Sequence, residues 1–486
     1  MKPSDMQSED PQNESILLQE TSADLSIPSP QTDQGSKSYV FLTAFVAAVG
    51  GFLFGYDLNI VAGAQQFLKD YFALDSAQFG RAMASALLGC LAGPFVGAWT
   101  CDRFGRRKSL IIACFFFGAG AIGTTLPQDI LMFNVFRIVG GIGVGLASLA
   151  SPMYIAEISP KGIRGMLVTM NQLAIVVGSL TAIIISYFLA QYLPASVSWR
   201  YMFASMLLPV GVFAVLLWKM PETPRWLSQR NRFDEAIQIL VKINGAHEGQ
   251  NEFNGIREEI EKETHTPKIS LTELFVPGVR IALMVGIVLA LMSQWTGWSM
   301  TAFYMPTIYR QAGIEDKAHA ILLTIIPNIA NLFYTFIAIY LVDLVGRRRL
   351  YLLCSLAMTV TMSMLGLVFV LQMNGWPVVA ILSLTAAPHA IGFGALCWLV
   401  LSEIFPTRIR ARAMSLCTAM VWIACFLVTY FTPVLFDLSQ RLFNVPSGVF
   451  FLCAFVSFIS FFFLMKVLPE TKGKSLEEIG RSWNLV

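Results

Sequence analysis

Twelve apolar runs, each roughly 20 residues long, follow one another from Val40 to about residue 467, with short polar breaks between them. An α-helix rises about 1.5 Å per residue, so a run of about 20 residues is long enough to cross the hydrocarbon core of a bilayer. This feature restricts the fold more than any other in the chain. It predicts an all-α membrane protein with twelve transmembrane helices.

The runs fall into two sets of six with a polar segment between them. We place them near residues 40–65, 78–100, 108–127, 130–154, 166–190 and 199–219, and then near 278–304, 318–342, 350–372, 377–402, 413–436 and 447–467. The predicted units are a disordered cytoplasmic tail (1–38), a six-helix bundle (39–219), cytoplasmic amphipathic helices (220–277), a second six-helix bundle (278–467) and a cytoplasmic tail (468–486).

Composition supports a membrane protein and disfavours several other classes. Hydrophobic residues make up 55% of the 486 residues and charged residues 13%, which is too few charges to cover a soluble globule of this size. The net charge of +3 gives no reason to expect nucleic acid as a partner. The eight cysteines lack the spacing of metal ligands, and no catalytic nucleophile or phosphate loop is found. We therefore predict no enzyme activity, no metal and no cofactor.

Three short motifs occur once in each half of the chain. The motif D-x-x-G-R-R begins at Asp102 and at Asp343, E-I-x-P-x-x-I-R begins at Glu157 and at Glu403, and P-E-T begins at Pro221 and at Pro469. The two copies of each motif are about half the chain apart and come in the same order. This predicts a duplicated architecture in which each half carries one copy of a six-helix unit.

Basic residues gather in alternate loops, after the second, fourth, eighth and tenth runs. Arginine and lysine are enriched in the cytoplasmic loops of membrane proteins. We therefore expect both termini and the central polar segment to be cytoplasmic. The expected location is the plasma membrane, as a multi-pass protein of a bacterial inner membrane.

These spans and motifs resemble the sugar porter family of the major facilitator superfamily. The resemblance covers about residues 40–475 and also rests on P-M-Y-I-A-E from Pro152, P-E-T-P-R from Pro221 and P-E-T-K-G from Pro469. Gly55-Tyr56-Asp57 and Cys397-Trp398 are similar to bacterial sugar/proton symporters such as xylose transporters. The resemblance implies the major facilitator fold, alternating access, and a monomer in the lipid bilayer whose partners are protons and a small neutral sugar or polyol.

Asp57 lies well inside the first run, where an ionised carboxylate is costly, so it is a candidate functional group. The alternative is an aspartate at the membrane interface, near a helix end. Arg137 lies at a similar depth in the fourth run, counted from the same side of the membrane. A carboxylate that pairs with an arginine in only one of two conformations can bind and release a proton. We predict that Asp57 and Arg137 form a proton-coupling pair.

A neutral polyhydroxylated solute needs amide groups as paired donors and acceptors, and aromatic faces for its C–H surfaces. The residues similar in placement to the family's sugar-binding residues are Gln172, Gln294, Ser299, Asn331, Trp398 and Trp422. Each of them could instead serve helix packing. Ser293 and Ser299 stand where the family pattern has Gln and Asn, which leaves the identity of the sugar open. His389 is expected to be a core histidine rather than a proton relay.

The charged residues of the loop motifs form a further candidate group. We expect them to make cytoplasmic ion-pair networks that hold the two halves together when the outer side is open. These residues are Asp102, Arg106, Glu157 and Arg164 in the first half, and Asp343, Arg347, Glu403 and Arg410 in the second.

The leading functional hypothesis is the import of a pentose, hexose or inositol by proton symport. A facilitative sugar uniporter and a transporter-like nutrient sensor are the alternatives. A drug/proton antiporter is disfavoured, because such proteins carry a Gly-Pro-rich motif in the fifth span and residues 173–188 contain no proline.

Overall fold

The structure is a computed structural model that describes residues 35–160, 162–265, 279–373, 375–405 and 409–470. Within these ranges every regular element is helical, and twelve helices are long and apolar enough to cross a membrane. A helix satisfies its own backbone N–H and C=O groups, which is required where no water is available. The predicted all-α fold with twelve transmembrane helices is confirmed. The tails before residue 35 and after residue 470 lie outside the described residues.

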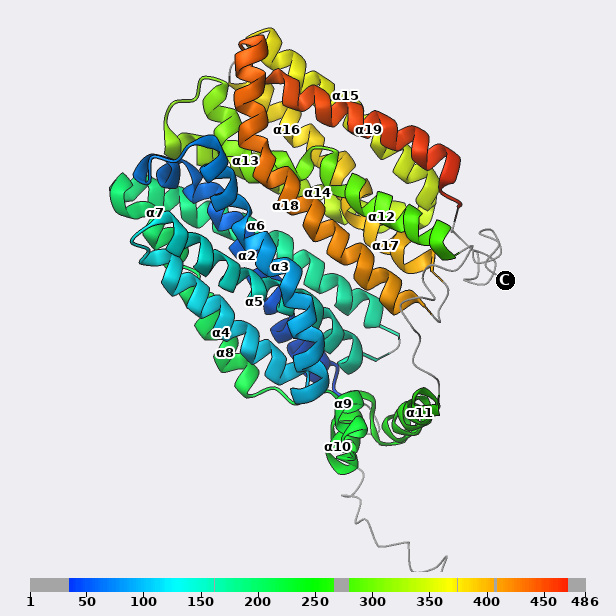
Figure 1. Cartoon of the computed structure of the whole chain (residues 1–486). Helices are drawn as coiled ribbons and strands as arrows, with labels where there is room; N and C mark the ends of the chain where they lie inside the picture. Colours follow the sequence, from blue (N-terminus) through cyan, green and yellow to red (C-terminus); the bar gives the residue numbers. More distant parts are fainter. Residues whose placement is uncertain (1–34, 161, 266–278, 374, 406–408, 471–486) are drawn as a thin grey trace, which may run out of the picture.

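The N-terminal bundle contains the first six spans (Figure 1). They are α2 (Lys37–Tyr71), α3 (Ser76–Phe104), α4 (Arg106–Thr125), α5 (Ile130–Ile158), α6 (Arg164–Tyr192), and α7 (Ala195–Ala204) followed by α8 (Leu207–Trp218). Aspartates start two of these helices. The carboxylates of Asp75 and Asp129 accept hydrogen bonds from the backbone N–H groups of Gln78 and Met132, each at 2.7 Å.

The C-terminal bundle contains the other six spans, two of which are interrupted. They are α12 (Val279–Trp295) with α13 (Trp298–Gln311), α14 (Lys317–Val345), α15 (Arg347–Val370), α16 (Trp376–Pro388) with η2 (His389–Gly394) and α17 (Ala395–Glu403), α18 (Arg410–Phe443) and α19 (Ser447–Val467). Gly297 separates α12 from α13 with a φ of 118°, a backbone conformation that glycine adopts most easily. The segment η2 is a π-helix within the tenth span.

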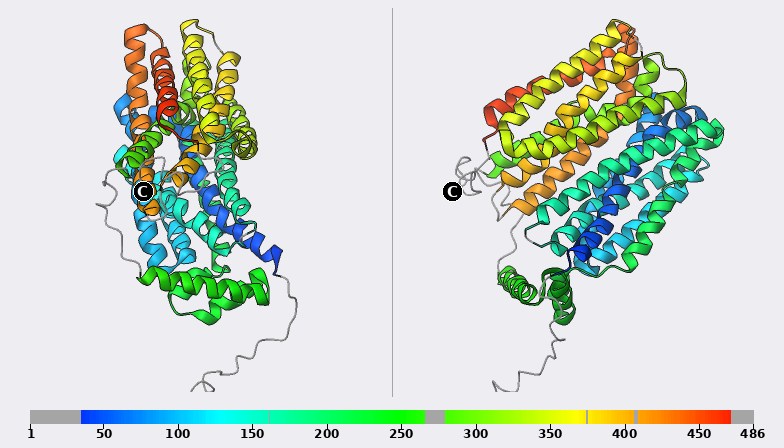
Figure 2. Two further views of the ribbon diagram at one scale, coloured as in Figure 1. Left: turned by 90° about the vertical axis from the view of Figure 1, so that its right-hand side faces the viewer. Right: turned by 180° about the vertical axis from the view of Figure 1, so that it is seen from behind.

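Three further helices, α9 (Pro224–Gln229), α10 (Phe233–Asn244) and α11 (Ala246–His265), lie across one end of the N-terminal bundle (Figure 2). At the same end of the molecule, α4 of the N-terminal bundle and α15 of the C-terminal bundle each begin with an arginine. We call this end the basic end. Trp226, Leu227, Ala236, Leu240 and Phe253 form a small apolar cluster of their own. The Trp226 indole N–H donates to the Asp102 carbonyl at 3.1 Å, which attaches these helices to the end of α3.

The outer surface is apolar, and the bundles approach each other closely where α3 meets α18. Large apolar side chains such as Phe95, Phe115 and Leu208 remain 66%, 71% and 76% exposed, as expected of a surface that faces lipid. Where α3 meets α18, a Cβ atom on Gly80 would lie 2.1 Å from the Tyr430 carbonyl oxygen. A glycine is therefore required for this close approach between the bundles.

Candidate functional site

Asp57 of α2 and Arg137 of α5 form a buried ion pair inside the N-terminal bundle. Arg137 Nη1 lies 2.9 Å from Asp57 Oδ1, and Nη2 donates to the Asp57 carbonyl oxygen at 3.3 Å. The two residues are only 4% and 2% exposed. Gly140, close to Arg137 on α5, faces the carboxylate, since its Cβ position would be 3.7 Å from Asp57 Oδ1. The predicted pairing is present, and its role in proton coupling stays a prediction.

This pair does not use all of its hydrogen-bonding capacity. Asp57 Oδ2 and Arg137 Nε are buried and have no hydrogen-bond partner among the described residues. The guanidinium carbon also lies 5.6 Å from the ring centroid of Phe203, a cation–π contact on its other side. A buried polar atom without a partner typically costs about 1–3 kcal/mol. The carboxylate therefore has an oxygen at which a proton can be accommodated without displacing Arg137.

The break in the seventh span brings Gln294 and Ser299 together. Ser299 Oγ donates to Gln294 Oε1 at 2.6 Å, and Gln294 Nε2 donates to Ser293 Oγ at 3.3 Å. Gln294 is half-buried, whereas both serines are buried. The two serines that replace the family's amides therefore contact the remaining amide and restrict its orientation.

The other predicted solute-binding residues are spread over both bundles. Asn331 of α14 is half-buried, with an Oδ1 atom that has no hydrogen-bond partner in the described part of the chain. Trp422 of α18 is buried, whereas Trp398 of α17 is 42% exposed and Gln172 of α6 is exposed. No described hydrogen bond or ring contact joins Gln172 or Trp398 to the other members of the predicted set.

Phe54 of α2 is a contact residue that the sequence did not reveal. Its ring centroid lies 5.9 Å from that of Trp422, so an aromatic pair connects the two bundles three residues before Asp57. A phenylalanine within an apolar run gives no functional signal. Only its contact with the Trp422 ring identifies it.

Polar bonds between the two bundles gather at the end opposite the basic end. We call this group the polar seam: Gln65, Gln66, Asp70 and Ser76 on one side, and Thr307, Arg310, Lys317 and Asp437 on the other. Gln66 Nε2 donates to Thr307 Oγ1 at 2.6 Å, and Arg310 Nη1 donates to Gln66 Oε1 at 2.6 Å. Lys317 pairs with Asp70, and Ser76 donates to Asp437. Two adjacent glutamines in an apolar run were the signal that could have found this seam.

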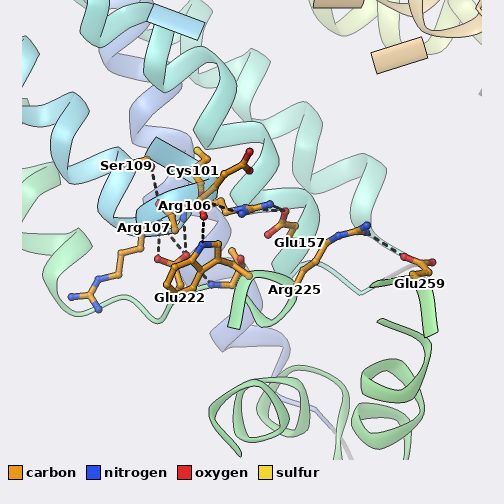
Figure 3. Close-up of polar contacts among 12 residues, drawn as sticks. Cys101, Arg106, Arg107, Ser109, Glu157, Glu222, Arg225 and Glu259 are labelled. Atoms are coloured by element: carbon orange, nitrogen blue, oxygen red, sulfur yellow. Dashed lines mark hydrogen bonds and ion pairs between the residues drawn. The ribbon is translucent and has the colours of Figure 1, made fainter. Parts of the chain in front are cut away.

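The predicted gating residues form ion pairs inside each half, and Figure 3 shows the pair of the N-terminal half. Arg106 Nη2 lies 2.8 Å from Glu157 Oε1 in the N-terminal bundle, and Arg347 Nη2 lies 3.3 Å from Glu403 Oε1 in the C-terminal bundle. Arg164 instead lies 3.7 Å from Glu252 of α11.

The remaining gating residues give less information about the predicted networks. The Asp102 carbonyl accepts from Trp226 and from Arg230, the latter at 2.9 Å. The side chains of Asp343 and Arg410 lie outside the described set. A network that bridges the two halves when the seam is open therefore stays a prediction.

Glu222 and Glu470, from the repeated P-E-T motif, hold equivalent positions in the two halves. Glu222 accepts the backbone N–H groups of Arg106 at 2.9 Å and Arg107 at 3.1 Å (Figure 3). Glu470 accepts those of Arg347 at 3.0 Å and of Arg348 at 3.2 Å. Each carboxylate thus caps the positive N-terminus of a helix. Burial raises the pKa of Glu222, and its bonds to the backbone N–H groups oppose that rise.

Known proteins resemble this chain over nearly its whole length. The model of the family described as Sugar (and other) transporter matches residues 43–483. The D-xylose-proton symporter of Escherichia coli (strain K12) is 35% identical over 483 residues, which covers 93% of this chain and 97% of that protein. The arabinose-proton symporter of Bacillus subtilis (strain 168) is 34% identical, with the same two coverages. The inward open conformation of the xylose transporter XylE from E. coli gives a TM-score of 0.80 at 33% identity, over 91% of this chain and 100% of that chain.

Proposed function

The chain belongs to the Sugar (and other) transporter family, a family of membrane transporters rather than enzymes, and from this premise we propose that it imports a pentose, hexose or inositol together with a proton. It does so as a monomer in a bacterial inner membrane, with both termini in the cytoplasm. The relatives that are symporters for xylose and for arabinose support a sugar and a proton as the two substrates.

The observation that carries this proposal is the buried pair of Asp57 and Arg137, whose charged atoms are 2.9 Å apart. A carboxylate at this depth is costly, which makes a function the expected reason for its presence, and its second oxygen has no partner among the described residues. Protonation removes the charge that attracts Arg137, so the pair can favour different arrangements of the bundle in its two protonation states. Binding of the proton thereby shifts the equilibrium between the conformations that carry the solute across the membrane.

The polar seam supports an alternating-access mechanism. In this conformation the seam joins the two bundles at one end, so solute and proton would leave toward the basic end. The solute would lie between the bundles, held by the amides of Gln294 and Asn331 and by the ring of Trp422. Gln172 and Trp398, which are exposed on membrane-spanning helices, are the groups we propose to close on it from the two sides.

Uptake into proteoliposomes tests the proposal. Pentoses, hexoses and inositols are supplied with and without an imposed pH difference. We expect one of these solutes to accumulate above its external concentration only when the outside is more acidic. Equilibration without accumulation would leave a facilitative uniporter, and no uptake of any of these solutes would refute the sugar assignment.

A further inference from the structure

The π-helical segment in the tenth span places His389 on the side of that span that carries Trp398. A π-helix bonds from residue i to residue i+5, so residues five apart stand over each other. Gly394 is five residues after His389, and a Cβ atom on Gly394 would lie 3.3 Å from His389 Nε2. Trp398 follows Gly394 by four residues, one turn of α17. His389, Gly394 and Trp398 therefore lie along one side of the span.

The imidazole ring is held against the broken seventh span. Its centroid lies 4.9 Å from that of Trp298, with 15° between the two planes. Trp298 is the first residue of α13, directly after the Gly297 break and directly before Ser299. The stacked pair therefore connects the tenth span to the place where Ser299 donates to Gln294. His389 therefore contacts the residue that directly precedes Ser299 in the chain.

One ring nitrogen of His389 bonds to no group in the described part of the chain. Nδ1 is buried and has no hydrogen-bond partner among the described residues. A nitrogen left in that state costs about 1–3 kcal/mol, and a phenylalanine would stack on Trp298 without that cost. Asn331 Oδ1 is also buried without a hydrogen-bond partner among the described residues, and its helix, α14, packs against η2. A hydroxyl group both donates and accepts, so it can pair with Nδ1 in either tautomer of the ring and with the Asn331 oxygen.

We propose that His389 is a specificity-determining residue that contacts the transported solute. Its Nδ1 atom hydrogen-bonds one hydroxyl of a monosaccharide or polyol, and Trp298 fixes the plane of the ring. This inference rests on the proposed function, because it requires a solute that binds beside Gln294, Asn331 and Trp398. It assigns His389 a role beyond that of a core histidine, and it involves no proton transfer.

The test measures binding of D-xylose, arabinose, glucose and myo-inositol to the purified protein, and then of every monodeoxy analogue of the solute that binds. In the wild type, one analogue should bind about 5- to 150-fold more weakly than its parent because it lacks the recognised hydroxyl. In His389→Phe the parent should weaken by that factor and become indistinguishable from this analogue. The ratios for the other analogues should not change. His389→Gln, which keeps a donor and an acceptor, should restore part of the discrimination.

His319→Phe is the matched control, because His319 is exposed at the start of α14, and all ratios should stay at wild-type values. If His389→Phe weakens the parent and all analogues equally, or changes none of them, His389 is only a packing residue and the inference is wrong. If His389→Phe does not fold, unchanged ratios in His389→Gln overturn it. If none of the four solutes binds the wild type, the proposed function fails, and this inference fails with it.

Discussion

Replacing Asp57 with asparagine should separate proton coupling from solute movement. The charged atoms of Asp57 and Arg137 are 2.9 Å apart, and both side chains are almost fully buried. Two unit charges 4 Å apart attract by about 4 kcal/mol at an effective dielectric constant of 20, so the variant loses an interaction of about this size. The amide oxygen of asparagine can still accept from Arg137 Nη1. The fold should therefore persist, in the arrangement that the protonated carboxyl favours, while titration is lost.

We expect Asp57→Asn to bind solute and to exchange labelled for unlabelled solute, but not to accumulate it. With one proton per solute, each unit of pH difference supplies about 1.4 kcal/mol, which is a tenfold concentration ratio. The wild type should therefore approach about tenfold accumulation per imposed pH unit, and the variant should stop at equal concentrations. The assay is uptake and counterflow in proteoliposomes, with thermal unfolding as a check on folding.

Asp129→Asn provides the matched control on the helix that carries Arg137. Asp129 is exposed and caps α5, and asparagine caps a helix about as well as aspartate does, so accumulation should equal that of the wild type. If Asp57→Asn still accumulates solute when only a pH difference is supplied, Asp57 is not the proton carrier. If the wild type exchanges solute but never accumulates it, the protein is a facilitator.

Three further predictions concern the solute site and the basic end. Gln172→Ala and Gln294→Ala should each weaken solute binding by about 5- to 150-fold in calorimetry, and unchanged affinity in both would remove them from the site. Glu403→Gln should slow transport, because it weakens the pair with Arg347 and shifts the populations of the inward-open and outward-open conformations. It should also change the labelling rate of a cysteine introduced in the polar seam. Slower transport with an unchanged labelling rate would contradict this prediction. Burial raises the pKa of Glu222 above its ordinary value, so its contribution to stability is present below about pH 4.3 and is lost as pH rises through the raised value. Between about pH 4.3 and the raised pKa, the melting temperature of Glu222→Gln should therefore vary less with pH than that of the wild type. An equal dependence of melting temperature on pH in the variant and the wild type would refute this reasoning.

The sequence predicted the existence of the spans better than it predicted their ends. The first run ends near residue 65 by its apolar character, but α2 continues to Tyr71. α2 continues through Gln65 and Gln66, whose amides bond to the C-terminal bundle. The two glutamines indicate a polar contact within the apolar run, but the partners are distant in sequence, so no local pattern could identify them. The breaks at Gly297 and at η2 were missed for a related reason, since an apolar run looks the same whether its helix is continuous or interrupted.

The parts of the candidate site differ in how far the sequence could indicate them. Asp57 and Arg137 could be paired from the sequence because charges in an apolar run need a partner, and helical rise gives their depth. Phe54 and Trp298 could not be found in this way. Aromatic residues are common in apolar runs, and their contacts with Trp422 and His389 depend on how whole helices pack.

The polar seam has a consequence for how easily the two bundles separate. Its bonds join amides, hydroxyls and charged groups, and water can form equivalent bonds with each of them as they part. The net loss is therefore about 0.5–1.5 kcal/mol for a bond between neutral groups and about 1.5–3 kcal/mol where a charged group takes part, less than the about 4–6 kcal/mol of a bond broken without water. Water thus competes with the protein for the same donors and acceptors. Parting the bundles at the seam therefore costs less than breaking the same number of bonds away from water would.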